Sequence, residues 1–405
     1  MPANFERLRA RMDELGLDAV VATTKENVLY LTGISNVTLD VHPHGGQCYV
    51  LVTRDRPDRP YVVSPRCDLD QTLDADVEIA GTVGFGDFFR EIDPAASLDR
   101  DERDLRRVAV DGPHAATALD ALVLAASRAG CATGTIAVDE DGVPYGFLDA
   151  VTEALPDARV RTGADVLRWT RKVKTPAEID RLTRAAAITE DAIRAATAIA
   201  RPGVTEIDLV REFDRTIVAA GARPAFTLIK FGRAAVGGQR LPRDVPLRAG
   251  ETVWMDVGCV HRGYWSDLAR VYSVGEPPDK LVRYHAAMKA GTDRALAEAR
   301  PGMSGKELFD IVMEAVRAAG VPHYRRQHVG HGIGVEIYDR VLITPTSDDV
   351  LEEGTVVNAE TPYHELGFGA VQIEDPFVVG RSGNRLLTSL GRDLATIDIP
   401  GGEPQ

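Results

Sequence analysis

Four acidic residues in the C-terminal half of the chain lie in apolar, strand-like segments rather than in polar stretches. Asp256 and Asp267 lie on the two arms of a predicted strand pair whose short turn contains Gly263. Glu360 and Glu374 lie on a second such pair. Burying a carboxylate is unfavourable unless a cation or a proton compensates its charge. One such acid would usually face water at a strand end, but four on two strand pairs favour a buried cluster whose charge two divalent cations would balance.

A histidine between glycines adds a possible nitrogen ligand. His331 lies in the segment Gly330-His-Gly-Ile-Gly334, where the glycines allow close approach of the backbone. By itself, a histidine in such a setting is more often structural than metal-bound. Together with four carboxylates it forms a donor set that suits manganese, iron(II), cobalt or zinc. We therefore expect two divalent ions per chain, with manganese as the first choice. Two ions roughly 3.5 Å apart can hold a hydroxide between them and polarise a carbonyl oxygen.

An internal repeat supplies the elements that would position these residues. Arg201-Pro-Gly-Val-Thr205 matches Arg300-Pro-Gly-Met-Ser304, at an offset of 99 residues (300 − 201 = 99), and the offset persists to Gly221 and Gly320. Each copy predicts a long helix, a Pro-Gly break, and a second helix capped by the last residue of the motif. Two copies are too few for a solenoid. We expect one pseudo-symmetric domain in which two helix pairs back a curved sheet.

The first half of the chain predicts a smaller α/β domain, because strand-like and helix-like segments alternate to about residue 167. A helix is predicted over Phe5–Leu15, and strands are predicted over Asp18–Ala22, Asn27–Gly33, Tyr49–Thr53 and Tyr61–Ser64. Near residue 170 a charged segment leads into a long helix, with Thr175 as its N-cap and Pro176 in its first turn. We expect one domain over residues 1–170 and a second over residues 171–405.

The bulk composition narrows the class of function. The chain has 405 residues, of which 44% are hydrophobic and 27% are charged, as in a globular protein of two domains. Its formal net charge of −14 argues against a general nucleic-acid or anionic-membrane binder. No apolar run reaches the roughly 18 residues of a membrane span. The N-terminus lacks a signal-peptide pattern, and the four cysteines form no Cys-x-x-Cys pair. We expect a cytoplasmic protein without nucleic-acid or membrane partners.

These motifs resemble the creatinase, prolidase and methionine aminopeptidase family, whose catalytic domain has the pita-bread fold. The metal set of that family matches five residues here: Asp256, Asp267, His331, Glu360 and Glu374. Their spacings (267 − 256 = 11; 374 − 360 = 14) are similar to those of prolidases. Gly16–Val21 and Asn27–Gly33 resemble segments of the creatinase/prolidase N-terminal domain. The resemblance implies an α+β chain: a smaller α/β domain, then a pita-bread catalytic domain with pseudo-symmetric helix pairs behind a curved antiparallel sheet.

The resemblance also implies an activity. It indicates a dinuclear metal-dependent hydrolase that cleaves an amide or peptide C–N bond by attack of a hydroxide held between the ions. The implied enzyme is a Xaa-Pro dipeptidase or is similar to aminopeptidase P, with a short peptide or another small molecule as substrate. Glu360 matches the family glutamate that both binds metal and handles the proton of the attacking water. A homodimer is implied by the resemblance alone.

Residues around the metal set depart from the family pattern. The family has a histidine at the position of Gln239, another at Tyr338, an arginine at Gln372, and a further histidine at Gln327, next to which His328 could compensate. An amide can neither transfer a proton near neutral pH nor supply a fixed charge. The hydroxyl group of Tyr338 could donate to a developing oxyanion. We expect Tyr338 to be catalytic and Gln239, His328 and Gln372 to bind substrate. The alternatives are a packed strand tyrosine and, for His328, a hydrogen bond to a metal ligand.

Two other functions stay open at this point. The same scaffold hosts creatine hydrolysis without metal and a metal-dependent sulfonium lyase, so the fold does not determine the reaction. The departures from the family pattern favour a non-peptide small metabolite as substrate of a lyase or amidinohydrolase-like enzyme. A non-catalytic, peptidase-like binding protein is the third possibility. Such proteins usually lose metal ligands, and this chain keeps all five.

Overall fold

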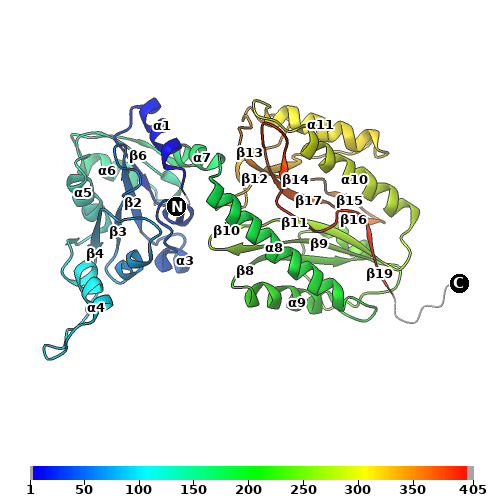
Figure 1. Cartoon of the computed structure of the whole chain (residues 1–405), viewed down its shortest axis with the longest axis horizontal. Helices are drawn as coiled ribbons and strands as arrows, with labels where there is room; N and C mark the ends of the chain where they lie inside the picture. Colours follow the sequence, from blue (N-terminus) through cyan, green and yellow to red (C-terminus); the bar gives the residue numbers. More distant parts are fainter. Residues whose placement is uncertain (1–2, 399–405) are drawn as a thin grey trace. The chain divides into compact units, whose positions relative to one another are not determined.

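The computed structural model describes residues 3–398, and its backbone separates into two compact units, residues 1–171 and 172–405 (Figure 1). None of the helices in the described part of the chain combines the length and apolar composition that a bilayer span requires. Each unit has its own sheet and its own hydrophobic core.

The first unit is built on a seven-stranded sheet with the strand order β5-β4-β3-β2-β1-β6-β7. Strand β2 is antiparallel to both of its neighbours, and the other pairs are parallel. The strands are β1 (Ala19–Ala22), β2 (Tyr49–Thr53), β3 (Tyr61–Pro65), β4 (Gly81–Phe85), β5 (His114–Ala115), β6 (Thr135–Val138) and β7 (Arg159–Thr162). The α-helices are α1 (Phe5–Leu15), α2 (Lys25–Thr32), α3 (Val37–Val41), α4 (Arg100–Leu105), α5 (Ala118–Arg128), α6 (Phe147–Ala154) and α7 (Ala164–Lys172).

The predicted strand over Asn27–Gly33 is wrong, because these residues form helix α2 and its C-cap. The hydroxyl group of Thr24 accepts a hydrogen bond from the backbone N–H of Asn27, and Gly33 ends the helix with a φ of 81°. Five of the eight helical residues are buried, so the segment shows no amphipathic period. A short apolar run of this kind is compatible with a strand and with a buried helix, and only its threonine and glycine caps distinguish the two.

The second unit contains a ten-stranded sheet whose strand pairs are antiparallel except for β11 with β19. The main strand order is β10-β9-β11-β17-β14-β12-β13, and β8 pairs with β9, β18 with β17 and β19 with β11. The strands are β8 (Arg223–Phe231), β9 (Thr252–His261), β10 (Tyr264–Trp265), β11 (Leu268–Val274), β12 (Gly330–Gly332), β13 (Asp339–Leu342), β14 (Val356–Glu360), β17 (Glu374–Val378), β18 (Arg385–Leu386) and β19 (Ala395–Ile397). A separate two-stranded ribbon joins β15 (Tyr363–Glu365) to β16 (Gly369–Val371).

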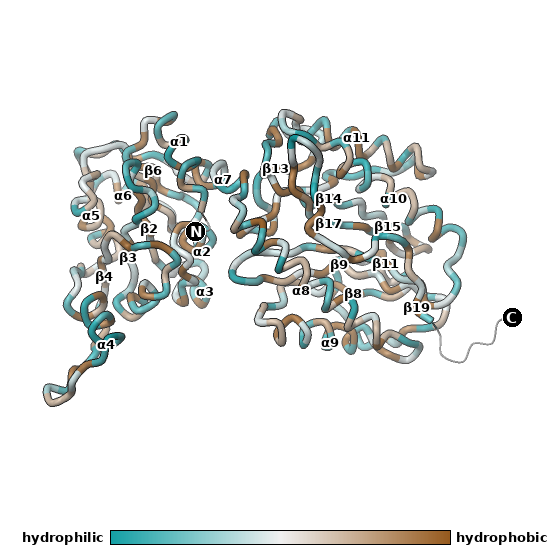
Figure 2. The backbone as a smooth tube through the Cα atoms, viewed as in Figure 1, coloured by the Kyte–Doolittle hydropathy of each residue, from teal (hydrophilic) through white to brown (hydrophobic). Residues whose placement is uncertain are grey.

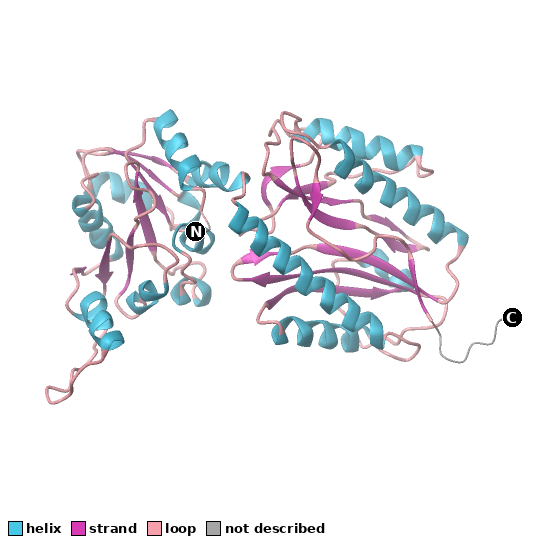
Figure 3. Ribbon diagram, viewed as in Figure 1, coloured by secondary structure: helices cyan, strands magenta, loops and turns pink. Residues whose placement is uncertain are grey.

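Two helix pairs pack on this sheet: α8 (Pro176–Ile199) with α9 (Glu206–Ala219), and α10 (Asp279–Glu298) with α11 (Gly305–Ala318) (Figures 1 and 3). The capping boxes predicted at Thr205 and Ser304 are both present. Equivalent backbone hydrogen bonds follow the 99-residue offset, since the N–H groups of Gly203 and Gly302 each donate to a carbonyl at 2.9 Å. The predicted pseudo-symmetric helix pairs behind an antiparallel sheet are therefore confirmed.

The helices bury one apolar face each against the sheet. In α9, Leu209, Phe213 and Ile217 recur every four residues and pack in the same core as Ile229 and Val253 of the sheet. Hydrophobic and hydrophilic residues alternate along the course of α9 (Figure 2). Strand β14 is buried along its whole length, so the central strands form a rigid support for the side chains that they carry.

A buried charge cluster lies at the start of α8. Lys174 Nζ lies 3.1 Å from Asp339 Oδ2, and both side chains are fully buried. Glu178, the third residue of α8, accepts hydrogen bonds from the backbone N–H of Thr175 and the hydroxyl group of Tyr264. Burial raises the pKa of Glu178 to about 7, even though the charge of Lys174 opposes the shift.

We predict that Glu178→Gln changes the pH dependence of stability. Glutamine keeps the capping box but removes the titrating group. Because burial raises the pKa of Glu178 from 4.5 to about 7, the folded chain holds a proton that the unfolded chain releases. The stabilisation from this group is fully present below the unfolded pKa and is lost as pH rises through the folded pKa. As pH rises from about 5 to about 8, the free energy of unfolding of the variant should therefore increase relative to that of the wild type, by up to about 3 kcal/mol.

Urea denaturation of both proteins across this pH range measures the difference. A gap between the two free energies that stays constant with pH would show that Glu178 does not titrate in this range.

Candidate metal centre

Strand register brings three of the predicted ligands, Asp256, Glu374 and Glu360, into one row across the second sheet, and the other two lie next to this row. Asp256 of β9 pairs with Ala269 of β11, which in turn pairs with Glu374 of β17. Glu374 also lies directly opposite Glu360, the last residue of β14. His331 belongs to β12, the next strand along, and Asp267 directly precedes β11. Five residues that are up to 118 positions apart in the sequence (374 − 256 = 118) therefore lie on neighbouring strands.

Three of these residues could hold a metal ion together. Asp267, His331 and Glu374 each offer a ligand atom, and these atoms lie within 4.8 Å of one another. His331 Nε2 lies 3.6 Å from Asp267 Oδ2 and 3.9 Å from Glu374 Oε1. Nδ1 of His331 is 2.9 Å from the carbonyl oxygen of Gly332, which can only accept, so the proton of a neutral ring resides on Nδ1. The lone pair of Nε2 is then directed at the carboxylates, as in a metal-binding histidine.

Gln372 connects this group to a fourth residue. Its Nε2 donates to Glu374 Oε2 at 2.8 Å and contacts Asp256 Oδ2 at 3.3 Å. A single amide thus holds two carboxylates side by side. Among the described residues, Asp267 Oδ1 and His331 Nε2 are buried and have no hydrogen-bond partner. Buried polar atoms rarely stay unpaired in proteins, and these two are directed into the same carboxylate cluster.

Glu360 occupies a different electrostatic position from the other acids. His328 Nε2 lies 2.5 Å from Glu360 Oε1, and Arg326 Nη2 lies 3.9 Å from Glu360 Oε2. Burial raises the pKa of Glu360, but the contact with His328 and the nearby positive charges outweigh it, so the pKa is lowered overall. Glu360 is therefore the acid of the cluster that most readily stays ionised.

The other carboxyl groups have raised pKa values. Burial is the main cause at Asp256, Asp267 and Glu374, and repulsion from neighbouring carboxylates adds to it. At His331 burial lowers the pKa, but the adjacent carboxylate of Asp267, 3.6 Å away, outweighs this and raises it. Asp256, Asp267 and Glu374 therefore favour a compensating proton or cation.

Glu374 is held by two further residues that sequence reasoning missed. Asn358 Nδ2 donates to Glu374 Oε1 at 2.6 Å. Arg270 donates to the backbone carbonyl of Glu374 at 3.0 Å and to Asp375 Oδ1 at 2.6 Å, which anchors the start of β17. The period of a strand could have identified Asn358, because residues two apart project to the same face and Glu360 lies two positions later. The role of Arg270 had no comparable signal in the sequence.

The predicted substrate-handling residues all line one cavity of about 710 Å³ above the carboxylates, namely Gln239, His328, Tyr338 and Gln372. The ring of Tyr338 stacks on His331 with centroids 4.0 Å apart and planes 22° apart. Its side chain is half-exposed, which places it on the cavity wall rather than in the core. Burial of the hydroxyl group, followed by repulsion from Glu360, raises the pKa of Tyr338, so it remains a hydrogen-bond donor at neutral pH.

Sequence reasoning did not single out several other residues of this cavity. Arg326, Trp254 and His364 line it, and apolar side chains such as Phe226 and Leu228 form part of the wall. Nε1 of Trp254 is buried without a hydrogen-bond partner among the described residues. Trp254 lies two residues before Asp256 on β9, so the same strand period could have placed it beside the site.

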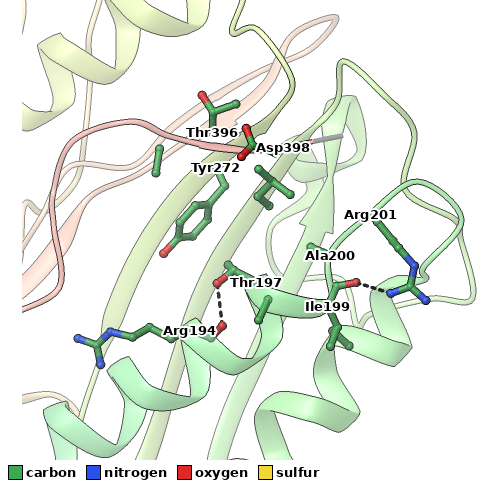
Figure 4. Close-up of a pocket in the computed structure, with 11 residues that line it drawn as sticks. Arg194, Thr197, Ile199, Ala200, Arg201, Tyr272, Thr396 and Asp398 are labelled. Atoms are coloured by element: carbon green, nitrogen blue, oxygen red, sulfur yellow. Dashed lines mark hydrogen bonds between the residues drawn. The ribbon is translucent and has the colours of Figure 1, made fainter. Parts of the chain in front are cut away.

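A second cavity in this unit lies away from the carboxylates. It has a volume of about 530 Å³ and is lined by the C-terminal end of α8 and by β19 (Figure 4). Thr197 Oγ1 donates to the carbonyl of Arg194 at 3.0 Å, and Arg201 Nη1 donates to the carbonyl of Ile199 at 3.2 Å. None of the predicted site residues lines this cavity. The candidate centre is therefore the cavity above the carboxylate cluster.

Comparisons with known proteins support this two-domain architecture. Residues 180–381 match the model of metallopeptidase family M24, and residues 5–173 match the creatinase/prolidase N-terminal domain. The chain is 26% identical to the uncharacterized peptidase YqhT of Bacillus subtilis over 396 residues, which cover 96% of this chain and 99% of the relative. It is 31% identical to a Xaa-Pro dipeptidase of Pyrococcus furiosus over 232 residues, which cover 57% of this chain and 67% of that protein.

The crystal structure of an X-Pro aminopeptidase from Thermotoga maritima has the same fold. It superposes with a TM-score of 0.76 at 23% identity and covers 97% of this chain and 99% of its own. The predicted α+β fold, with a creatinase-like N-terminal domain followed by a pita-bread domain, is thereby confirmed. The chain belongs to metallopeptidase family M24 and is a metallohydrolase.

Proposed function

We propose that this protein is a dinuclear metal-dependent hydrolase that cleaves an amide or peptide C–N bond, as a Xaa-Pro dipeptidase or an enzyme similar to aminopeptidase P. The observation that carries the proposal is a set of five ligand-type side chains that lie together at one cavity: Asp256, Asp267, Glu360 and Glu374 line it, and His331 is buried beside Asp267 and Glu374. The relatives described as Xaa-Pro dipeptidases support the choice of substrate.

The residues present fit a pair of divalent cations. Nε2 of His331 and Oδ1 of Asp267 are buried acceptors without a partner among the described residues, and the carboxyl groups around them have raised pKa values because they are buried and repel one another. Oxygen donors with one imidazole suit manganese, iron, cobalt or zinc, and manganese is our first choice. When bound, such ions supply Lewis acidity toward a carbonyl oxygen and lower the pKa of water.

The chain's own residues supply the remaining functions. Glu360 is the proposed acid–base residue, because it matches the family glutamate with this role and because it lies in the cavity wall with its Oε1 2.5 Å from His328 Nε2. Tyr338 offers a phenolic hydrogen to an oxygen that gains negative charge. Gln239 and Gln372 present amide groups to the substrate or to the carboxylates beneath it.

A second candidate keeps the centre but changes the substrate. Gln239, Tyr338 and Gln372 stand where the family resemblance places two histidines and an arginine. This change removes groups that transfer protons or carry a fixed charge, which favours a non-peptide small metabolite. Screening lyase and amidine substrates against the metal-loaded protein tests this candidate, and a negative screen together with peptide hydrolysis would reject it.

We also propose domain bounds, a cellular location and an oligomeric state for this chain. We assign residues 1–170 to the creatinase-like domain and residues 171–405 to catalysis. Cytoplasmic localisation is supported by the four cysteines, which are all free. The homodimer implied by the family resemblance is a prediction that light scattering on the purified chain can test.

Gln372→Ala should weaken metal binding without unfolding the protein. The side chain holds Asp256 and Glu374 by contacts of 3.3 and 2.8 Å, and groups that orient metal ligands typically contribute ten- to a hundredfold in affinity. Calorimetric titration of the metal-free protein with Mn²⁺ measures this loss. Gln327→Ala, which removes an exposed amide from the wall of the same cavity, serves as the matched control. Equal affinities in the two variants would refute the role of Gln372.

Glu360→Gln should abolish most of the peptidase activity. In the Mn²⁺-loaded protein we expect hydrolysis of a Xaa-Pro dipeptide such as Ala-Pro, and a fall in kcat of about 10²- to 10⁴-fold in the variant, because an amide cannot accept the proton.

Tyr338→Phe keeps the ring on His331 but removes one donor, so kcat should fall about a hundredfold with metal content unchanged. A metal-loaded wild type that cleaves no Xaa-Pro dipeptide would exclude the proposed substrate.

A further inference from the structure

Arg326 is the one arginine or lysine among the described residues that line the cavity above the carboxylates. Its side chain is 16% exposed, and its Nε is buried without a hydrogen-bond partner in the described part of the chain. A guanidinium group has five donor hydrogens in a rigid planar fork that matches a carboxylate. Arg326 is thus a fixed positive charge whose capacity to donate is only partly used.

Glu360, the carboxylate that forms an ion pair with Arg326, is also a proposed metal ligand. Its Nη2 lies 3.9 Å from Glu360 Oε2, beyond the length of a hydrogen bond. In the proposed function Glu360 belongs to the set that holds two cations, which would neutralise the four carboxylates. Arg326 would then remain as a largely buried cation without an anion nearby, which is unfavourable. A ligand that enters the cavity has to supply that anion.

No other arginine or lysine among the described residues of the cavity could supply this fixed positive charge. Gln372, which stands where the family resemblance places an arginine, carries no charge, and its amide already contacts Asp256 and Glu374. The wall of the cavity also has an apolar part, to which Phe226 and Leu228 contribute. The cavity therefore suits a ligand with a small apolar body and one anionic end.

We infer that Arg326 binds the free carboxylate of a dipeptide-sized substrate. The inference rests on the proposed function and sharpens it. The guanidinium lies within 3.9 Å of Glu360, the proposed acid–base residue, so only a short span separates the anion from the bond that is cut. A single residue beyond the scissile bond, such as a C-terminal proline, provides that span. Longer peptides and peptide amides would place an uncharged group against Arg326.

Binding of an acid and of its amide tests this inference. The probes are N-acetyl-L-proline and N-acetyl-L-prolinamide, titrated by calorimetry into the Mn²⁺-loaded wild type and into Arg326→Gln and Arg326→Lys. Arg325→Gln is the matched control, because it removes the same charge from the exposed neighbouring residue, outside the cavity lining. The Mn²⁺ content of each protein is measured by elemental analysis alongside the titrations.

We expect the wild type and Arg325→Gln to bind the acid at least tenfold more tightly than the amide. Arg326→Gln should bind the acid about ten- to a hundredfold more weakly and the amide unchanged, as expected for the loss of a charged hydrogen bond. Arg326→Lys should restore part of the preference, since it keeps the charge but not the fork. A wild type without the preference, an Arg326→Gln variant that keeps it, or an equal loss for both probes together with lost Mn²⁺ would overturn the inference.

Turnover of Ala-Pro and Ala-Pro-Ala separates this inference from the proposed function. A wild type that cleaves neither peptide but prefers the acid through Arg326 would reject the peptidase and keep the carboxylate site. A wild type that cleaves both peptides equally well and shows no preference for the acid would keep the peptidase and overturn the role of Arg326. Cleavage of Ala-Pro alone, with the preference lost in Arg326→Gln, is the result that both proposals expect.

Discussion

Mutual repulsion of buried carboxylates is the constraint on which the rest of this structure depends. Asp267, Glu360 and Glu374 are buried in the second unit, and Asp256 lies half-buried beside them; burial and mutual repulsion raise the pKa values of Asp256, Asp267 and Glu374. Such a cluster is unfavourable in a low-dielectric interior unless protons or cations compensate it. Hydrogen bonds from Asn358 and Gln372 nevertheless hold Glu374 in the cluster. Cations in the centre would compensate the charge of the carboxylates that these contacts hold together.

The antiparallel sheet is what makes this convergence possible. Asp256 and Glu374 flank Ala269 in the register of three neighbouring strands, and Glu360 lies opposite Glu374. A shift of one residue in any of these pairings would turn a ligand to the opposite face of the sheet. The repeated helix pairs share hydrophobic cores with this sheet, so fold and site are parts of one arrangement.

The sequence predicted those parts of the molecule that leave a local pattern. The repeat at an offset of 99 residues, the caps and the five ligand-type residues are visible as spacing and residue type. Helix α2 was missed because a short, mostly buried helix has no amphipathic period. Arg326 and Arg270 could not be assigned for another reason: their roles depend on contacts with residues 34 and 105 positions away (360 − 326 = 34; 375 − 270 = 105), and no local pattern encodes those contacts.

Anomalous diffraction from crystals of the Mn²⁺-loaded protein tests the central claim most directly, because it locates bound metal independently of activity. Data collected at the manganese absorption edge should show two peaks among Asp256, Asp267, His331, Glu360 and Glu374, with His331 Nε2 directed at one of them. Crystals of the loaded protein that show no anomalous peak there, with the carboxyl groups hydrogen-bonded to one another instead, would mean that protons stabilise the cluster. The metalloenzyme account would then be wrong.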